Sequence, residues 1–345
     1  MHLSADLLDE IYVAYGLSPG MATTRASRVS ERVWRLPTTG GGVAVKFYAE
    51  DQLARARKET ALVTHLNTQG DHRFRVQTLL RTSAGAPLWV GRHARAMVSA
   101  WAPGTTRTYD TYTLAEWAAL GTSLASLHLS LEQYPATLSD TLLARLAAFD
   151  IDEIRRELAA APSCATELAQ TRVPAYALTQ ADKHGLQAYV DACLRLIDQH
   201  YSGSLAGFPA DDPQCPIHND YNQFNYLFGE TLPPLILDWE ASIGAPREYE
   251  VVRCLNHLPL EAPAAAAAFV QAYLRVRPLR AERMAWAVDA ASLQHALKRW
   301  ILQGWLRDPQ RYTTHLHGAM RMVAMMADAR ARLIDFFARC VQEEN

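Results

Sequence analysis

The stretch PIHNDYNQFNYLFGETLPPLILDWEASIGAP, residues 216–246, decides how the rest of the chain is interpreted. Its composition is typical of an irregular loop followed by a short hairpin. His218, Asp220 and Asn225 form an H-x-D-x-x-x-x-N pattern in the loop, and Asp238 follows at the end of an apolar strand. A carboxylate and a carboxamide five residues apart on such a loop can reach one metal–phosphate cluster from two sides, and Asp238 is well placed to join them.

Phosphoryl transfer is the chemistry that this arrangement fits, because it asks a protein mainly for positioning and charge neutralisation. An acceptor hydroxyl must lie in line with the γ-phosphate, and a carboxylate must lie near the departing proton. Magnesium needs hard oxygen ligands, and a cation must hold the remaining phosphates. Residues 218–225 supply much of this set in one short loop, and Asp238 is well placed to be the second hard-oxygen ligand.

The first hundred residues mix strand and helix signals. Residues 28–36 and 42–48 are predicted as strands around a Gly-rich turn at 37–42, and a helix is expected over 51–67. Further strand-like runs lie at 76–80, 87–90 and 96–101. This order is typical of a small antiparallel sheet with one helix packed on it.

The remainder of the chain is mainly helical. Thr113 and Glu116 form a capping box at the start of one helix. Further helices are expected over residues 141–160, 180–200, 263–276, 281–305 and 313–343. The sequence therefore predicts an α+β fold with two lobes, a lobe with a small antiparallel sheet over 1–101 and a larger, mainly helical lobe over 102–345.

The loop and the later D-W-E resemble the catalytic loop and metal-binding motif of the aminoglycoside phosphotransferase/choline kinase superfamily, small-molecule kinases with a protein-kinase-like fold. The resemblance implies that Asp220 orients and deprotonates the acceptor hydroxyl, and that Asn225 and Asp238 bind magnesium. D-W-E is similar to the family's D-x-D/E variants, so Glu240 is expected to assist at the edge of the metal or substrate site. His218 is interpreted as a structural residue that hydrogen-bonds the loop.

The resemblance extends into the N-terminal lobe. Lys46 lies in the strand GVAVKFY, where the family places the lysine that contacts the α- and β-phosphates. Glu59 lies on the following helix, where the partner of that lysine is expected. Residues 96–104, AMVSAWAPG, are similar to the strand and hinge that bind adenine through backbone groups, with Ser99 and Trp101 near the base. The N-terminal lobe is thus expected to bind the nucleotide and the helical lobe to bind the acceptor.

The chain departs from the family at the front of the nucleotide site. No G-x-G-x-x-G loop precedes the first strands, and ATTRASR, residues 22–28, occupies its place. Gly40–Gly42 directly precedes the lysine strand and is interpreted as a hairpin turn. The phosphate contacts from this side are therefore expected to differ from those of a Gly-rich loop.

The predicted function is O-phosphorylation of a small hydroxylated molecule (an antibiotic, a sugar, an amino sugar or an amino alcohol), with Mg²⁺ and ATP or another nucleoside triphosphate as cofactors. One alternative is a catalytically silent, kinase-like nucleotide-binding module, although the chain keeps Asp220, Asn225, Asp238 and Lys46. A protein kinase is less favoured, because D-W-E replaces D-F-G and no A-P-E segment follows. The sequence does not identify the acceptor.

The bulk properties agree with a cytoplasmic enzyme. A length of 345 residues suffices for two lobes, and a net charge of -2 gives no reason to expect nucleic acid or an anionic membrane as partner. The N-terminus has no signal pattern, no long apolar run occurs, and the five cysteines include no C-x-x-C pair. A monomer or homodimer is expected.

Overall fold

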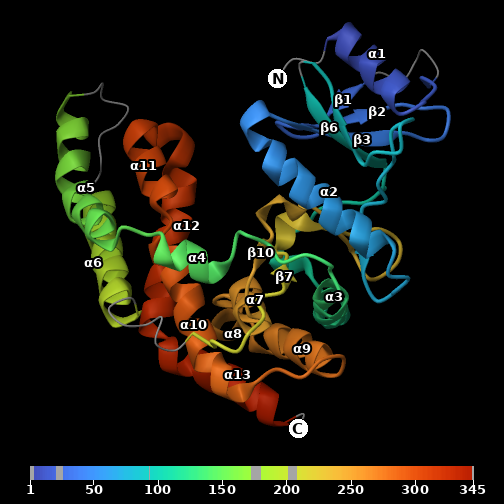
Figure 1. Ribbon diagram of the computed structural model, residues 1–345. Coiled ribbons are helices and arrows are strands. Elements are labelled where there is room, and N and C mark those ends of the chain that lie inside the picture. Colours follow the sequence, from blue (N-terminus) through green and yellow to red (C-terminus); the bar gives the residue numbers. More distant parts are fainter. Residues whose placement is uncertain (1–3, 21–25, 93, 172–179, 201–207, 344–345) are drawn as a thin grey trace. The chain divides into compact units, whose positions relative to one another are not determined.

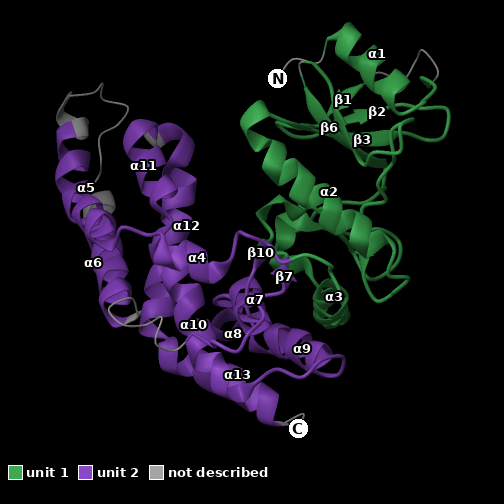
Figure 2. Cartoon of the chain, in the orientation of Figure 1, with its two compact units in different colours: residues 1–136, 218–242 green, residues 137–217, 243–345 purple. Residues whose placement is uncertain are grey.

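The computed structural model describes residues 4–20, 26–92, 94–171, 180–200 and 208–343. The chain divides into two compact units, which Figure 2 shows in different colours. Unit 1 comprises residues 1–136 and 218–242, and unit 2 comprises residues 137–217 and 243–345. The predicted catalytic loop therefore belongs to the same unit as the N-terminal sheet. The functional division into a nucleotide lobe, 1–101, and an acceptor lobe, 102–345, stays a prediction.

Unit 1 is built on a five-stranded antiparallel sheet in the order β1-β2-β3-β6-β5 (Figure 1). Its strands are β1 (Ser27–Arg28), β2 (Val33–Leu36), β3 (Val43–Tyr48), β5 (Leu88–Val90) and β6 (Arg95–Ala100). The predicted hairpin between β2 and β3 is present, and Gly41 and Gly42 have φ angles of 112° and 123° in its turn. Residues with a side chain rarely adopt such angles, which explains the glycine run.

The two faces of this sheet pack against different helices. Helix α1 (Ala5–Ala14), which the sequence analysis did not assign, covers one face through a buried cluster with β3: Ile11, Tyr15, Val43, Val45 and Phe47. Because side chains alternate along a strand, Lys46 and Tyr48 point to the other face. There Tyr48 packs with Ala56 of helix α2 (Leu53–Asn67). This alternation directs Lys46 toward α2, the helix that carries Glu59.

Helix α3 (Leu114–Glu132) begins with the predicted capping box. The side-chain oxygen of Thr113 accepts the N–H of Glu116 at 3.2 Å, and the Glu116 carboxylate accepts the N–H of Thr113 at 2.8 Å. Two backbone donors that a helix start leaves unpaired are thereby satisfied. The buried side of α3 includes Leu120, whose carbonyl accepts the hydroxyl of Tyr221 from the catalytic loop at 2.9 Å.

A second, three-stranded sheet in unit 1 holds the catalytic loop. It contains, in order, β4 (Arg75–Val76), β9 (Leu235–Ile236) and β8 (Tyr226–Leu227). β8 and β9 are antiparallel, with Tyr226 opposite Ile236. The N–H of Leu237 also donates to the carbonyl of Asn225 at 2.9 Å, so the pairing continues past the end of both strands.

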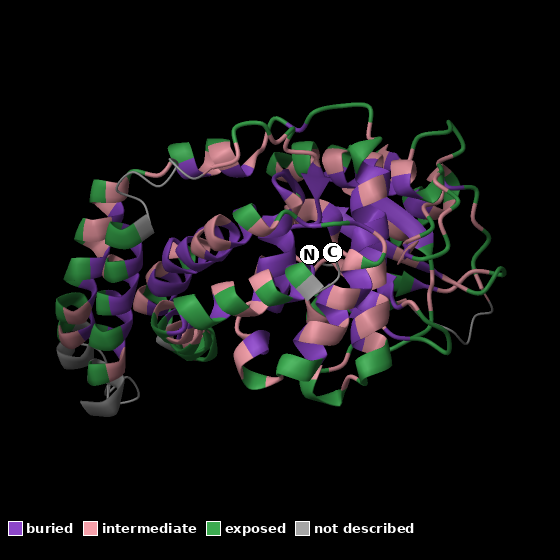
Figure 3. Ribbon diagram, turned by 90° about the horizontal axis from the view of Figure 1, so that it is seen from below, coloured by how far each residue is buried: buried purple, intermediate pink, exposed green. Residues whose placement is uncertain are grey.

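Unit 2 is mainly helical, with one short antiparallel pair of strands. The strands are β7 (Pro216–Ile217) and β10 (Ile243–Gly244). The helices are α4 (Leu142–Ala147), α5 (Ile151–Thr171), α6 (Gln180–His200), α7 (Arg247–Leu255), α8 (Leu258–Glu261), α9 (Pro263–Leu274), α10 (Ala281–Ala296), α11 (Arg299–Arg307), α12 (Pro309–Asp328) and α13 (Arg330–Glu343). α10 packs against α6, α7, α12 and α13. Figure 3 shows that the helices have buried residues on one side and exposed residues on the other. None of the helices that the structure describes combines the length and the apolar character needed to cross a bilayer.

Several predicted elements are shorter or divided. The strand predicted over 28–36 is wrong at its centre, because residues 29–32 form the turn between β1 and β2, where the N–H of Val29 donates to the carbonyl of Val33 at 2.9 Å. The strand predicted over 76–80 is reduced to β4 and a single bridge between Leu79 and Ser99. The helices predicted over 141–160, 281–305 and 313–343 are each two helices.

The helix breaks come from capping residues and from local backbone turns. Asp150 ends the first break by accepting the N–H of Glu153 at 2.9 Å. The break between α12 and α13 falls at Ala329, whereas Asp308, which precedes the predicted helix 313–343, starts α12 by accepting the N–H of Arg311 at 3.2 Å. Such short polar side chains pair with the free N–H groups at a helix start. The break between α10 and α11 falls at Leu297 and Lys298, where the sequence has neither glycine nor proline.

Candidate active site

A buried ion pair joins the sheet of unit 1 to α2. The Nζ atom of Lys46 lies 3.0 and 2.8 Å from the two carboxylate oxygens of Glu59. Glu59 is fully buried, and the side chain of Lys46 is 9% exposed. The strand lysine and the helix glutamate that the sequence analysis paired are therefore in contact.

The Glu59 carboxylate accepts four hydrogen bonds. Besides the two from Lys46, the hydroxyl of Tyr48 donates to Oε2 at 2.7 Å and the N–H of Trp239 donates to Oε1 at 3.2 Å. Burying a carboxylate is costly unless donors replace the lost water, and these four donors do so. Because Trp239 is the central residue of D-W-E, Glu59 also fixes that motif against α2.

Lys46 is shared among three carboxylates. Its Nζ atom lies 2.6 Å from Oδ1 of Asp238 and 3.3 Å from Oε2 of Glu240, in addition to the contacts with Glu59. Burial alone would lower the pKa of Lys46, but the three carboxylates raise it above its ordinary value. The lysine is thus held as a cation at the point where the sheet, α2 and D-W-E meet.

The predicted catalytic carboxylate is held by two asparagines of its own loop. Nδ2 of Asn222 donates to Oδ1 of Asp220 at 2.9 Å, and Nδ2 of Asn225 donates to Oδ2 at 2.8 Å. Each carboxylate oxygen can accept a second hydrogen bond, so Asp220 retains acceptor capacity for a substrate hydroxyl. The two asparagines thus orient the carboxylate and leave it able to accept a hydrogen bond from a substrate.

The β8–β9 hairpin brings the backbone of Asn225 beside Leu237, the residue that precedes Asp238. Asn225 directly precedes β8, and its carbonyl is paired with Leu237, the residue before Asp238. The side-chain hydrogen bonds of Asn225 are made by Nδ2, whereas Oδ1 is the atom that a magnesium ion would bind. Asp238 adopts φ 63° and ψ 73°, a left-handed conformation that Asp tolerates better than most residues and that is common at functional sites.

His218 ties the start of the catalytic loop to the end of the hairpin. Its Nδ1 accepts the N–H of Asp220 at 3.2 Å, and its Nε2 lies 2.9 Å from the carbonyl oxygen of Leu237. Nδ1 must be unprotonated to accept, and Nε2 must carry the proton to donate to a carbonyl. Both ring nitrogens are occupied by backbone partners, which agrees with the structural role predicted for His218.

Arg32 is a site residue that the sequence analysis missed. It lies in the turn between β1 and β2, and its guanidinium contacts Glu240 through two bonds, Nη1 to Oε2 at 2.9 Å and Nη2 to Oε1 at 2.7 Å. Glu240 is 18% exposed and therefore lies within the site rather than on the open surface. Although burial alone would raise it, the hydrogen bonds from Arg32 and the charge of Lys46 lower the pKa of Glu240 to about 2.

This lowered pKa predicts an acid-sensitive contribution to stability. A carboxyl group with a depressed pKa in the folded state stabilises that state above its unfolded pKa of about 4.3, and the contribution is lost as the pH falls toward 2. We expect Glu240→Gln to lower the free energy of unfolding by about 1–3 kcal/mol at pH 7 and by much less at pH 3. Urea unfolding of both proteins at the two pH values measures this difference, and an equal difference at both would contradict the assignment.

The residues at this site fit a magnesium ion by charge and by ligand type. Three carboxylates (Glu59, Asp238 and Glu240) contact two cations (Lys46 and Arg32), so this cluster has one more negative than positive group. One oxygen from each of Glu59, Asp238 and Glu240 lies within 4.8 Å of the others. Hard oxygen ligands of this kind suit Mg²⁺. Asp238, whose side chain is 39% exposed, is the most accessible of the three.

The predicted adenine-binding residues lie on and directly after β6. Ser99 is buried and lies opposite Ala44 of β3, whereas Trp101 follows the strand and stacks under the guanidinium of Arg35 at 4.6 Å. The N–H of Trp101 donates to the carbonyl of Gly42 at 3.2 Å. This amide is thus already used within the sheet, and the contacts of Ser99 and Trp101 with a base stay a prediction.

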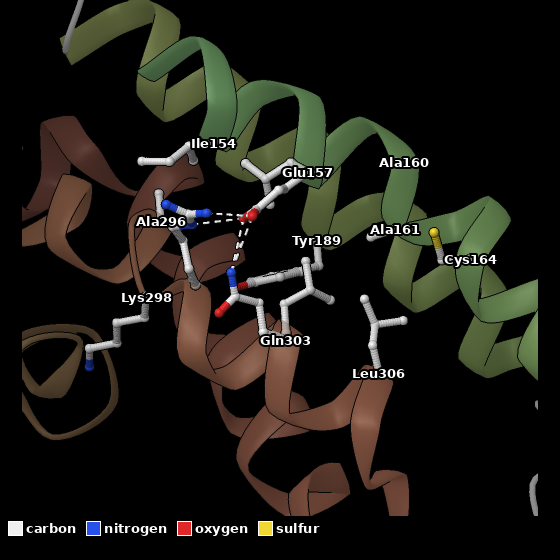
Figure 4. Close-up of a pocket in the computed structure, with 13 residues that line it drawn as sticks. Ile154, Glu157, Ala160, Ala161, Cys164, Tyr189, Ala296, Lys298, Gln303 and Leu306 are labelled. Atoms are coloured by element: carbon white, nitrogen blue, oxygen red, sulfur yellow. Dashed lines mark hydrogen bonds and ion pairs between the residues drawn. The ribbon is translucent and has the colours of Figure 1, made fainter. Parts of the chain in front are cut away.

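Unit 2 contains a separate small cavity of about 200 Å³ between α5, α6 and α11 (Figure 4). Its charged residue Glu157 accepts hydrogen bonds from Arg299, at 2.7 Å from Nε, and from Gln303 at 3.2 Å. The hydrogen bonds from Arg299 hold the pKa of Glu157 below its usual range. The remaining lining is largely apolar, with Ile154 and Leu306 among the side chains drawn. The cavity includes none of the predicted phosphotransfer residues.

Comparison with known proteins identifies the family. Residues 22–286 match the model of the phosphotransferase enzyme family, whereas comparison with the sequences of curated proteins gives no match. The structure resembles spectinomycin phosphotransferase APH(9)-Ia in complex with ADP and spectinomycin, with a TM-score of 0.64 and 14% identity over 96% of this chain and 99% of that chain. It also resembles amicoumacin kinase hAmiN in complex with AMP-PNP, Ca²⁺ and Ami, with a TM-score of 0.63 and 12% identity over 93% of each chain.

A third similar structure is the microcompartment-associated aminopropanol kinase, with a TM-score of 0.57 and 16% identity over 98% of this chain and 100% of that chain. At these identities the likeness shows a shared fold. The predicted α+β, protein-kinase-like fold and the predicted superfamily are confirmed. Because the family model matches more than half of the sequence, the chain belongs to the phosphotransferase enzyme family.

Proposed function

We propose that the protein is a cytoplasmic kinase of small molecules that transfers the γ-phosphoryl group of ATP, with Mg²⁺, to a hydroxyl group. The observation that carries the proposal is the meeting of Lys46, Glu59 and Asp238 in unit 1, beside a hairpin that joins Asp238 to the loop of Asp220 and Asn225. Family membership supports phosphotransfer to small molecules. We expect the protein to act as a monomer or homodimer, without a nucleic-acid or membrane partner.

Each residue has a distinct role in the proposed reaction. Asp220 accepts the proton of the acceptor hydroxyl while that oxygen bonds to the γ-phosphorus, the bond between this phosphorus and the bridging oxygen of ADP breaks, and ADP leaves. Lys46 holds the non-transferred phosphates, and Glu59 holds Lys46. Asn225 Oδ1 and a carboxylate oxygen of Asp238 would hold the magnesium ion, which neutralises the charge of the phosphates when bound.

The acceptor is proposed to be an amine-bearing alcohol, an amino sugar or an aminoglycoside-type antibiotic. The similar structures include enzymes named for an antibiotic and for aminopropanol, so the fold accommodates acceptors of quite different size. Fold does not determine the acceptor, because acceptor contacts come from a small number of side chains. Small amino alcohols and larger amino sugars therefore both belong in the first screen.

The test is ADP release by the purified protein with MgATP and a panel of hydroxylated amines, sugars, amino sugars and aminoglycosides. We expect one class of acceptor to raise ADP release well above the rate with water alone, and mass spectrometry to detect the phosphorylated acceptor. Nucleotide binding without release, across an acceptor panel that also includes proteins, would favour a silent nucleotide-binding module. Phosphate found only on added proteins would favour a protein kinase.

A further inference from the structure

Two cations of unit 1 converge on one carboxylate. Arg32 contacts both oxygens of Glu240, at 2.9 and 2.7 Å, and Nζ of Lys46 lies 3.3 Å from Oε2, the oxygen that Nη1 of Arg32 also contacts. In the sheet, Val33 lies opposite Lys46, and the carbonyl of Arg32 accepts the N–H of Phe47 at 2.9 Å. The register of β2 and β3 thus places the backbone of Arg32 one residue beyond the Val33–Lys46 pair, and both side chains reach the same carboxylate, Glu240.

This pair of cations has the chemistry of an anion-binding site. A guanidinium fork can bind either a carboxylate or a phosphate group through two parallel hydrogen bonds, because both present a pair of oxygens to it. Lys46 adds a point charge to the same oxygen. Glu240 therefore occupies a place in which a phosphate oxygen would make the same contacts.

We propose that Arg32 and Lys46 together form a binding site for a nucleotide phosphate, and that Glu240 occupies this site as a placeholder until the nucleotide displaces it. This inference rests on the proposed function. It assigns phosphate binding to Arg32 in a chain that has no G-x-G-x-x-G loop before its first strands. Arg32 lies in the turn between β1 and β2, and its side chain is 35% exposed, so a ligand can reach it.

The exchange conserves the pairing of charges. In the ligand-free protein Asp238 and Glu240 pair with Lys46 and Arg32, in addition to the buried pair of Lys46 with Glu59. When a phosphate takes over the two cations, the two carboxylates become available for a divalent cation, which they are chemically suited to bind. A nucleotide that arrives without metal must compete with Glu240 and leaves it without a partner, so the placeholder favours binding of nucleotide and metal together.

The experiment measures ADP affinity by calorimetry in the presence of EDTA, where Glu240 can act only as a competitor. We expect Arg32→Gln to weaken ADP binding by about tenfold to a hundredfold, since charge-assisted hydrogen bonds are lost. Arg32→Lys, which keeps the charge without the fork, should fall between this variant and the wild type. Glu240→Gln should tighten ADP binding at least about threefold, since the competing charge is removed.

Two matched controls separate local effects from the general change in charge. Arg81→Gln removes a cation whose one hydrogen bond among the described residues goes to a loop carbonyl, that of Gly85, and Glu50→Gln removes an exposed carboxylate that pairs with Arg95. Neither should change ADP affinity by more than about twofold, because exposed charges interact weakly. Circular dichroism and thermal unfolding of each variant verify that it is folded.

The outcomes distinguish this inference from the proposed function. Wild-type binding of ADP with an unchanged affinity in Arg32→Gln would overturn the role of Arg32 and leave the kinase proposal intact. Weaker binding in Glu240→Gln would show that Glu240 positions Arg32 instead of competing for it, which also overturns the placeholder. If the wild-type protein binds no nucleotide with or without Mg²⁺, the proposed function fails and the inference fails with it.

Discussion

Replacing Asp220 by Asn is expected to reduce the turnover of the best acceptor by about 10²–10⁴-fold, the usual worth of a general base. The carboxylate is held at 2.9 and 2.8 Å by the side chains of Asn222 and Asn225, so its position is fixed before substrate arrives. An amide at this position cannot take the proton of the hydroxyl. Steady-state ADP release with saturating acceptor measures the effect.

The same substitution should leave nucleotide binding within about threefold of the wild type. In the part of the chain that the structure describes, no hydrogen bond joins Asp220 to Lys46 or to Glu59. The free energy of unfolding should fall by only about 1 kcal/mol, because one of the two hydrogen bonds to this side chain is weakened. Near-normal turnover of the purified Asp220→Asn protein would refute the assignment of Asp220 as the base.

Replacing Glu59 by Gln is expected to lower the free energy of unfolding by about 3 kcal/mol. The substitution removes the buried one of the three carboxylates that contact Lys46, and it turns an amide N–H group toward one of three donors, Lys46, Tyr48 or Trp239. Breaking a buried pair in this way is costly because the remaining charge stays buried. Urea unfolding at pH 7 measures the loss.

The matched control for this prediction is Glu50→Gln, which removes an exposed carboxylate that pairs with the guanidinium of Arg95 at the surface. That change should cost less than about 1 kcal/mol, as surface pairs usually do. Nucleotide affinity should also fall in Glu59→Gln, because Lys46 loses the partner that holds it in place. Equal stability losses in the two variants would show that the buried pair has no special role in the fold.

The sequence revealed the parts of the site that depend on local pattern. The local pattern predicted the strand that carries Lys46 and the helix that carries Glu59, and the resemblance to the family then predicted that the two side chains pair, which they do. The spacing of Asp220 and Asn225 predicted that both side chains lie on one irregular loop, whereas the hydrogen bond of 2.8 Å between them was not predicted. These features can be predicted because strand alternation and loop spacing are determined within a short stretch of chain.

What the sequence did not reveal depends on contacts between distant segments. Arg32 and Glu240 are 208 residues apart in the sequence, and no local pattern around either residue indicates that they form an ion pair. The turn at 29–32 was predicted as strand because it contains neither glycine nor proline, the residues that most often mark a turn. The break between α10 and α11 was missed for the same reason. The phosphate-loop prediction at 22–28 falls mostly on residues outside the described ranges.

The most direct test of the central claim is calorimetric titration of the wild-type protein with a non-hydrolysable ATP analogue and Mg²⁺, alongside Asp238→Asn and a titration in EDTA. Asp238 links the lysine pair to the hairpin of the catalytic loop, so the account predicts one nucleotide bound per chain. It also predicts affinity at least about tenfold weaker in Asp238→Asn, because a charged ligand of the metal is lost. Absence of nucleotide binding, or binding that neither the substitution nor removal of Mg²⁺ affects, would contradict the account.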